Sequence, residues 1–166
     1  MTDHADNFEM KVPAKAEYVG VVRLTVSGIA SRAGYSYDDI EDMKIAVAEA
    51  CTNVVNHAYK KTGYMLLSCV IREDRIQIIV ADRGESTEVS RLLENIGPID
   101  SSKPVSELKE GGLGLFLIDT LMDKVEISNE SGVAIVMTKF LHRDGVEQHV
   151  DGIPTSTDKQ EQGQKQ

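Results

Sequence analysis

Four polar residues at helical spacing form the first group in this sequence that could do chemistry. They are Glu49, Asn53, Asn56 and His57, and they fall within an arc of roughly 100° on one side of a helix. Asparagine is a poor helix former, so two of them in one helix need a reason. A carboxylate one turn from an amide can pair a base with a Mg²⁺ ligand. The alternative is a solvated polar face, which fits His57 better.

The second group is Asp82-Arg83-Gly84, which directly follows a strongly apolar segment. Asp followed by Gly is common turn chemistry, and a plain turn is one interpretation. In a pocket, a partly buried carboxylate can accept a hydrogen bond from an exocyclic amino group, and the glycine lets a flat base approach the backbone. The residues alone leave both interpretations open.

The third group is the glycine-rich segment 110–115, Glu-Gly-Gly-Leu-Gly-Leu, which leads into a predicted helix. It is not a Walker A loop, because no Gly-Lys-Ser/Thr follows, and it lacks the third glycine and the preceding strand of a dinucleotide fingerprint. Glycines at a helix start still allow close backbone approach, and the free N–H groups with the helix dipole favour a phosphate. A flexible hinge is the alternative.

Hydrophobic periodicity predicts the elements that position these groups. In chain order we expect a strand, two helices, a hairpin, a helix and a second hairpin. This order predicts an α/β two-layer sandwich, with helices on one face of a mixed, mostly antiparallel sheet. The expected ranges are 7–12, 13–34, 37–58, 65–72 with 76–81, 113–122, and 124–129 with 133–141.

Two segments differ from this pattern. Residues 82–112 are rich in turn residues and charges, and so long a connection in a compact domain is usually a lid or a binding loop. We therefore expect a lid at about 85–110. Residues 142–166 contain five Gln and eight charged residues, which predicts a polar, disordered tail. The predicted domain is 1–141.

Composition excludes several classes of protein. With 27 acidic and 18 basic residues, the net charge is -9 and the pI is near 4.9, which opposes direct binding to nucleic acid or to anionic membranes. The longest uncharged apolar run has eight residues, 64–71, whereas a spanning helix needs about 20. Cys51 and Cys69 have no C-x-x-C partner and are expected to be buried hydrophobes in a reducing compartment. We expect a cytoplasmic protein.

The three groups together resemble a known family. A helix with Glu-x3-Asn, a strand-end Asp-x-Gly and a Gly-x-Gly before a helix follow the layout of the GHKL (Bergerat) ATP-binding superfamily. The sequences of these segments are also similar to those of the small anti-sigma factor serine-protein kinases. The segments that carry this similarity are EACTNVVNHAY at 49–59, VADRG at 80–84 and EGGLGLFLI at 110–118.

The resemblance implies roles for individual residues. Glu49 would be the general base, Asn53 the Mg²⁺ ligand and Asp82 the acceptor for the adenine amino group. Gly84 would border the adenine, Gly112, Gly114 and the Leu115 amide would surround the phosphates, and Thr138 would be a second adenine contact. Some relatives carry an Arg just before the Gly-x-Gly, where Glu110 and Gly111 stand here. The cation for the γ-phosphate is therefore left open between Lys109, Lys103 and Arg83.

The resemblance also implies a function. We expect an ATP- and Mg²⁺-dependent protein serine kinase that sequesters the sigma factor sigma-B, phosphorylates a serine of an anti-anti-sigma protein and forms a homodimer. One alternative is a nucleotide-gated anti-sigma binding module without kinase activity, although binding alone needs no base such as Glu49. The other is a histidine-kinase catalytic domain, but a strand starting near residue 7 leaves no room for a phosphoacceptor helix pair.

Overall fold

The computed structural model describes residues 4–57, 63–82, 97–98, 112–128 and 133–142. Apart from 97–98, the predicted lid lies outside these residues, and so does the predicted tail from 143 onward. The described elements, in chain order, are β1 (Asp6–Pro13), the 3-10 turn η1 (Ala16–Tyr18), α1 (Val19–Ala33), α2 (Tyr37–His57), β2 (Tyr64–Ile71), β3 (Arg75–Ala81), β4 (Gly97–Pro98), α4 (Gly112–Leu121), β5 (Lys124–Ser128) and β6 (Ala134–Phe140).

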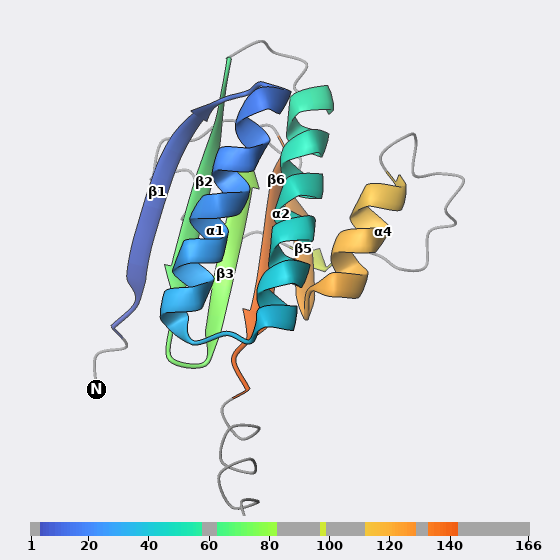
Figure 1. The fold of residues 1–166 in the computed structure, drawn as a ribbon. Coiled ribbons are helices and arrows are strands. Elements are labelled where there is room, and N and C mark those ends of the chain that lie inside the picture. The colour runs from blue at the N-terminus through green and yellow to red at the C-terminus, as the bar shows by residue number, and fades with distance from the viewer. Residues whose placement is uncertain (1–3, 58–62, 83–96, 99–111, 129–132, 143–166) are drawn as a thin grey trace, which may run out of the picture.

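The strands form one sheet whose order is β1-β2-β3-β6-β5-β4. Every strand pair within the described residues is antiparallel. In Figure 1, α1 and α2 lie side by side over one face of this sheet, and α4 stands beside α2 near β5. The predicted α/β sandwich with its helices on one face is therefore confirmed.

The core lies between the helices and the sheet. α1 buries Val22, Val26 and Ala30 at successive turns, and α2 buries a similar stripe of Met43, Val47, Ala50, Cys51 and Val54. β1, β2, β3, β5 and β6 contribute alternate residues to this core, because successive side chains of a strand point to opposite faces. On both helices the buried residues follow the 3.6-residue period of an amphipathic helix.

The junction of α1 and α2 is set by two local signals. Gly34 follows α1 with φ +96°, a left-handed conformation that glycine adopts without steric cost. Two residues later, Ser36 Oγ accepts a hydrogen bond from the backbone N–H of Asp39 at 3.2 Å, which is an N-cap interaction. These two caps turn the chain from one helix directly into the next.

The predicted start of the first helix at Pro13 and Ala14 is wrong. Pro13 is the last residue of β1, and the N–H of Ala14 donates to the carbonyl of Gly63 at 2.8 Å. This contact keeps the chain extended beside β2, so α1 begins only at Val19, after η1. The signal that delays the helix comes from a residue far along the chain.

The two ends of the described sandwich lie at the same end of the sheet. Asp6 at the start of β1 pairs with Ile71, and the N–H of Leu141, just after β6, donates to the carbonyl of Asp74 at 2.8 Å. Both positions therefore border the β2–β3 hairpin. Asp82, which follows β3, lies at the opposite end.

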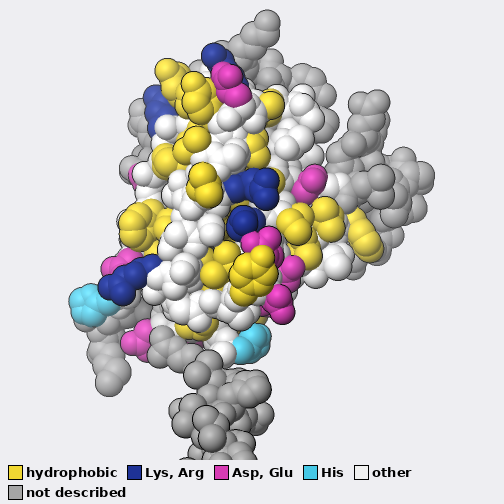
Figure 2. All heavy atoms as spheres, in the orientation of Figure 1, with side chains coloured by type: hydrophobic (Ala, Val, Ile, Leu, Met, Phe, Trp, Pro, Cys, Tyr) yellow, Lys and Arg dark blue, Asp and Glu magenta, His cyan; other side chains and the backbone are white. Residues whose placement is uncertain are grey.

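The outer surface of the helix layer carries apolar side chains in separate places. Figure 2 shows hydrophobic side chains over α1 and over α4, with basic and acidic side chains between them. Leu24 on α1 is 73% exposed and Phe116 on α4 is 65% exposed. Among the described residues, no helix is long and apolar enough to cross a membrane.

Candidate functional site

Helix α2 supplies the carboxylate and the amide of the site. Glu49 and Asn53 lie one turn apart and are both half-buried, whereas Asn56 is exposed. Nδ2 of Asn53 is buried and has no hydrogen-bond partner in the part of the chain that the structure describes. The side chain of His57 lies outside the description. Of the predicted polar face, Glu49 and Asn53 are therefore enclosed, while Asn56 faces solvent.

Helix α4 brings its glycine-rich end against this pair. A Cβ atom placed on Gly114 would lie 3.0 Å from Glu49 Oε2 and 3.5 Å from Asn53 Nδ2. A side chain at this position would push the carboxylate aside by a few tenths of an ångström, so glycine favours the close approach. Two motifs that are distant in the sequence thus meet in the fold.

The start of α4 is suited to bind an anion. Gly112 is the first residue of the helix, and the first backbone N–H groups of a helix have no partner within it. These groups and the positive end of the helix dipole attract phosphate. Leu115 is half-buried and packs on the hydrophobic core, which fixes this first turn. The predicted phosphate-binding residues Gly112, Gly114 and Leu115 therefore share one helix end.

Asp82 lies just beyond β3 and is held by the chain that enters β6. Its Oδ1 accepts a hydrogen bond from the N–H of Val133 at 3.0 Å, and its own N–H donates to the Val133 carbonyl at 3.1 Å. Ile78 and Val80 face the helix layer, and strand alternation continues to Asp82 on that same side. A carboxylate can accept several hydrogen bonds, so this contact orients it. Gly84 lies outside the described residues.

The structure places Thr138, the predicted second adenine contact, away from Asp82. Along β6, Met137 belongs to the core beneath the helices, while Val136 packs on the other face of the sheet. Thr138 shares the face of Val136 by alternation. It also lies five residues from Val133, which contacts Asp82, and this corresponds to about 17 Å along an antiparallel strand. The two-residue period of β6 is the signal that indicates this placement.

The donor set fits Mg²⁺ when most of its ligands come from phosphate and water. Within the described ranges, no cluster of three or more His, Cys, Asp or Glu could hold a metal by itself. Mg²⁺ commonly takes only one or two protein oxygens beside nucleotide phosphates. The amide of Asn53 is buried without a partner for Nδ2, and a 180° rotation exchanges its nitrogen and oxygen. It can therefore present either a donor to phosphate or an oxygen to the cation.

The remaining predictions concern the two cysteines and the candidate cations for the γ-phosphate. Cys51 and Cys69 are free and buried, and burial raises the pKa of each thiol to about 12. Both therefore stay protonated at neutral pH and act as small hydrophobes, as predicted. The cation candidates Arg83, Lys103 and Lys109 lie outside the described residues.

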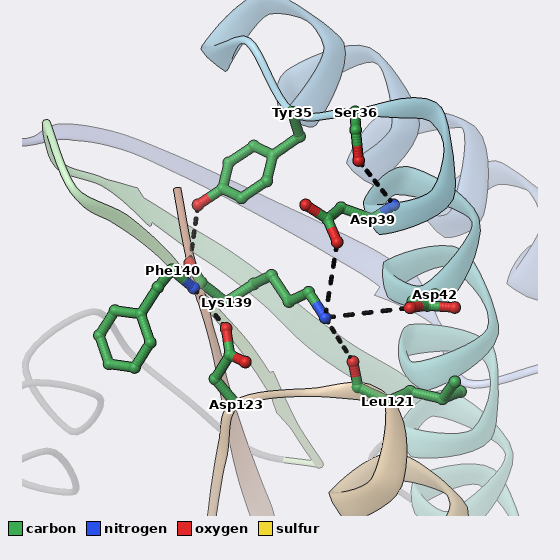
Figure 3. Close-up of polar contacts among 8 residues, drawn as sticks. All are labelled: Tyr35, Ser36, Asp39, Asp42, Leu121, Asp123, Lys139 and Phe140. Carbon is green, nitrogen blue, oxygen red and sulfur yellow. Dashed lines mark hydrogen bonds and ion pairs between the residues drawn. The ribbon is translucent and has the colours of Figure 1, made fainter. Parts of the chain in front are cut away.

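Sequence reasoning missed a second polar cluster at the other end of α4. Lys139 is its centre, and it contacts Leu121, Asp39 and Asp42, as Figure 3 shows. The available signal was a lysine inside the strand Ala-Ile-Val-Met-Thr-Lys-Phe, on the face that β6 turns toward the core. Buried lysines need partners, but the sequence did not indicate which residues these would be.

Comparison with known proteins agrees with this geometry. Residues 12–139 match the family model of the histidine kinase-like ATPase domain. The crystal structure of the RsbU and RsbW domains of Rv1364c from Mycobacterium tuberculosis has a similar fold, with a TM-score of 0.58 and 16% identity. The similarity covers 81% of this chain and 32% of that chain. Fold and site thus define a histidine kinase-like ATPase.

Two curated relatives place the chain more narrowly within this family. Serine-protein kinase RsbW from Halalkalibacterium halodurans is 63% identical over 155 residues, which is 93% of this chain and 96% of the relative. Serine-protein kinase RsbW from Bacillus cereus strain AH187 is 51% identical over 158 residues, covering 95% and 98%. The chain belongs to the histidine kinase-like ATPase family and, within it, to the RsbW serine-protein kinases.

Proposed function

We propose that this protein is an ATP-dependent serine-protein kinase that acts as an anti-sigma factor. It sequesters sigma-B and phosphorylates a serine of the corresponding anti-anti-sigma protein. The observation that carries the proposal is the approach of Gly114 to Glu49 and Asn53, because it joins a phosphate-binding helix end to a potential base. The names of the relatives and their coverage of nearly the whole chain support the same function.

The nucleotide lies between β3 and α4 in this proposal. Asp82 accepts a hydrogen bond from the adenine amino group, and Gly84 borders the ring. The first backbone amides of α4, at Gly112, Gly114 and Leu115, donate to the phosphates. Asp82 is already oriented by the N–H of Val133, so the adenine end needs little rearrangement.

The chemistry falls to the two residues of α2. Glu49 accepts the proton of the substrate serine as the serine oxygen attacks the γ-phosphorus of ATP, and the bond from this phosphorus to the β–γ bridging oxygen breaks, so that ADP leaves. Asn53 would hold Mg²⁺, which supplies positive charge to the phosphates when it is bound. Phosphoryl transfer requires little covalent help from a protein, so positioning and one base suffice. The glycine-rich end of α4 lies against Glu49 and shields the reacting hydroxyl from water.

Four further features belong to the proposal. The catalytic domain comprises residues 1–141 with its lid at 85–110, the polar tail comprises 142–166, and the protein works in the cytoplasm.

The protein acts as a homodimer, for which the exposed apolar side chains of Val21 and Leu24 on α1 offer contact area. Sedimentation at micromolar concentration tests the dimer, and an 18 kDa monomer would contradict it. Removal of residues after Leu141 should leave the melting temperature and kinase activity unchanged.

A phosphorylation assay tests the function itself. The substrates are the anti-anti-sigma protein, a serine-to-alanine variant at its acceptor site and a histidine-to-alanine variant. We expect transfer to the parent protein and to the histidine variant, and none to the serine variant. A pull-down of sigma-B with ATP and then ADP accompanies it. Nucleotide-dependent sigma binding without any transfer would instead identify a binding module, and transfer that requires histidine would identify a histidine kinase.

A further inference from the structure

Lys139 contacts the C-terminal end of α4, opposite to the glycine-rich end. It lies in β6, is only 9% exposed, and its Nζ donates to the carbonyl of Leu121 at 2.7 Å. Leu121 is the last residue of α4. The last carbonyls of a helix have no partner within it and carry the negative end of its dipole. An ammonium group at this position therefore caps α4, as Figure 3 shows.

The same ammonium group also reaches α2. Its Nζ lies 3.8 Å from Asp39 Oδ1 and 3.9 Å from Asp42 Oδ2. Both aspartates belong to the first two turns of α2, so one cation joins the end of α4 to the start of α2. The two carboxylates compensate a charge that would otherwise be costly to enclose.

The strand that carries Lys139 is itself held firmly. The hydroxyl of Tyr35, between α1 and α2, donates to the Lys139 carbonyl at 2.7 Å. Oδ2 of Asp123, between α4 and β5, accepts from the N–H of Phe140 at 2.7 Å. Burial raises the pKa of Tyr35 above its usual value, so it remains a donor. These hydrogen bonds hold the backbone of β6 at Lys139 in place, so its ammonium group binds the end of α4 from a fixed position.

Because α4 is long, a small tilt about its Leu121 end produces a large displacement at the end near Glu49 and Asn53. Ten residues span about 15 Å of helix, so a tilt of roughly 10° about the Leu121 end moves the far end by about 2.6 Å. Gly114, near that far end, would place a Cβ only 3.0 Å from Glu49 Oε2. A tilt of this size would therefore separate the two helices where the site lies.

We infer that Lys139 is a positioning residue for phosphoryl transfer, which it serves by fixing α4 so that its glycine-rich end lies over Glu49 and Asn53. This inference rests on the proposed function. Lys139 contacts no reacting atom. A misplacement of about 1 Å can cost about 10²-fold in rate, whereas adenine recognition by Asp82 depends on β3 and β6 and not on α4. Loss of the ammonium group should therefore affect transfer more than ADP affinity.

Three variants of the full chain test this inference. Lys139→Met keeps the aliphatic stem and removes the charge, Lys139→Arg keeps a charge, and Lys124→Met is the control. Lys124 is an exposed lysine of β5 paired with Glu126 at 2.8 Å. We expect kcat to fall by about tenfold to 10²-fold in Lys139→Met, with at least partial recovery in Lys139→Arg. ADP affinity should fall by less than kcat, because Asp82 still binds the adenine, and Lys124→Met should behave like the parent. A normal kcat in Lys139→Met overturns the inference.

Amide hydrogen exchange without nucleotide provides a readout that needs no activity. In Lys139→Met, the amides of α4 should exchange faster, while those of α1 keep the rates of the Lys124→Met control. Equal acceleration in α1 and α4, or none in α4, overturns the inference even if the parent protein is an active kinase. If the parent transfers no phosphate, the proposed function fails, and the exchange rates still decide whether Lys139 fixes α4.

Discussion

The two ends of α4 contact polar clusters of opposite character. At its C-terminal end, the Lys139 ammonium has a carbonyl and two carboxylates around it. At its N-terminal end, α4 approaches Asn53, whose buried Nδ2 lacks a partner in the described residues. An unpartnered buried polar group costs about 1–3 kcal/mol, whereas a paired one stabilises the fold. We interpret the first cluster as structural and the second as prepared for a ligand.

The largest effect is expected for Glu49→Gln. This change keeps the shape of the side chain but removes the base, so phosphoryl transfer should fall by about 10² to 10⁴, while ATP and sigma-factor binding persist. Steady-state kinase assays and calorimetry measure the two properties. The matched control is Glu41→Gln on the same helix, where Glu41 pairs with Lys44 at 2.9 Å. Normal transfer by Glu49→Gln would contradict the base assignment.

The next effect is expected for Asn53→Ala, and it separates ligand binding from stability. ATP affinity in Mg²⁺ should fall by about tenfold or more, because the phosphates lose the cation ligand. The free energy of unfolding should not decrease, because the residue removed contains an unpartnered buried group. The control is Asn56→Ala, an exposed site three residues on, which corrects for the higher helix propensity of alanine. A clear loss of stability relative to this control would show that Asn53 is structural.

A smaller and more uniform effect is expected for Asp82→Asn. The amide can still accept from the N–H of Val133, but it lacks the charge that strengthens the bond to the adenine amino group. A loss of about 1.4 kcal/mol corresponds to a tenfold weaker affinity. Calorimetry should give the same loss for ATP and ADP, because the phosphate end is unchanged. A loss confined to ATP would place Asp82 beside the phosphates instead.

The smallest effect on activity is expected at buried groups outside both clusters, where only the pH dependence of stability changes. Folding raises the pKa of the Cys51 and Cys69 thiols to about 12. Their contribution to stability is complete below the pKa of an unfolded thiol and is lost as the pH rises toward 12. Above pH 9, each thiol should remove up to about 1.4 kcal/mol of stability per pH unit. Urea unfolding at pH 8 and pH 10.5 measures this slope, which Cys51→Ala should reduce. A slope unchanged by Cys51→Ala would show that its thiol ionises alike in both states.

The sequence predicted the elements well where local patterns determine them. The stripe containing Val22 and Val26 follows the 3.6-residue period, and the strand pairs alternate with turns between them. It failed where a distant contact decides the outcome. The bond from Ala14 to Gly63 delays α1, and no pattern near residue 14 announces it. The two-residue strand β4 was also not predicted, because so short a segment carries no period.

The sequence predicted those parts of the candidate site that local motifs form. Gly114 next to Glu49 and Asn53 agrees with the expected meeting of two motifs. Thr138 lies on the face of β6 away from the helices, which follows from the alternation of side chains along that strand. Lys139 was missed for another reason: its partners Asp39 and Leu121 are contributed by two other elements. Only the three-dimensional fold identifies such a cluster.

The position of the first and last strands of the described sandwich has a mechanical consequence. β1 begins and β6 ends beside the β2–β3 hairpin. A force that separates these ends pulls β1 sideways from β2, starting at the pair of Asp6 and Ile71. The hydrogen bonds of an antiparallel pair then carry the load one after another, because they lie across the strands. The edge strand therefore peels away at low force, and a tether on both ends would load the sheet far from Asp82 first.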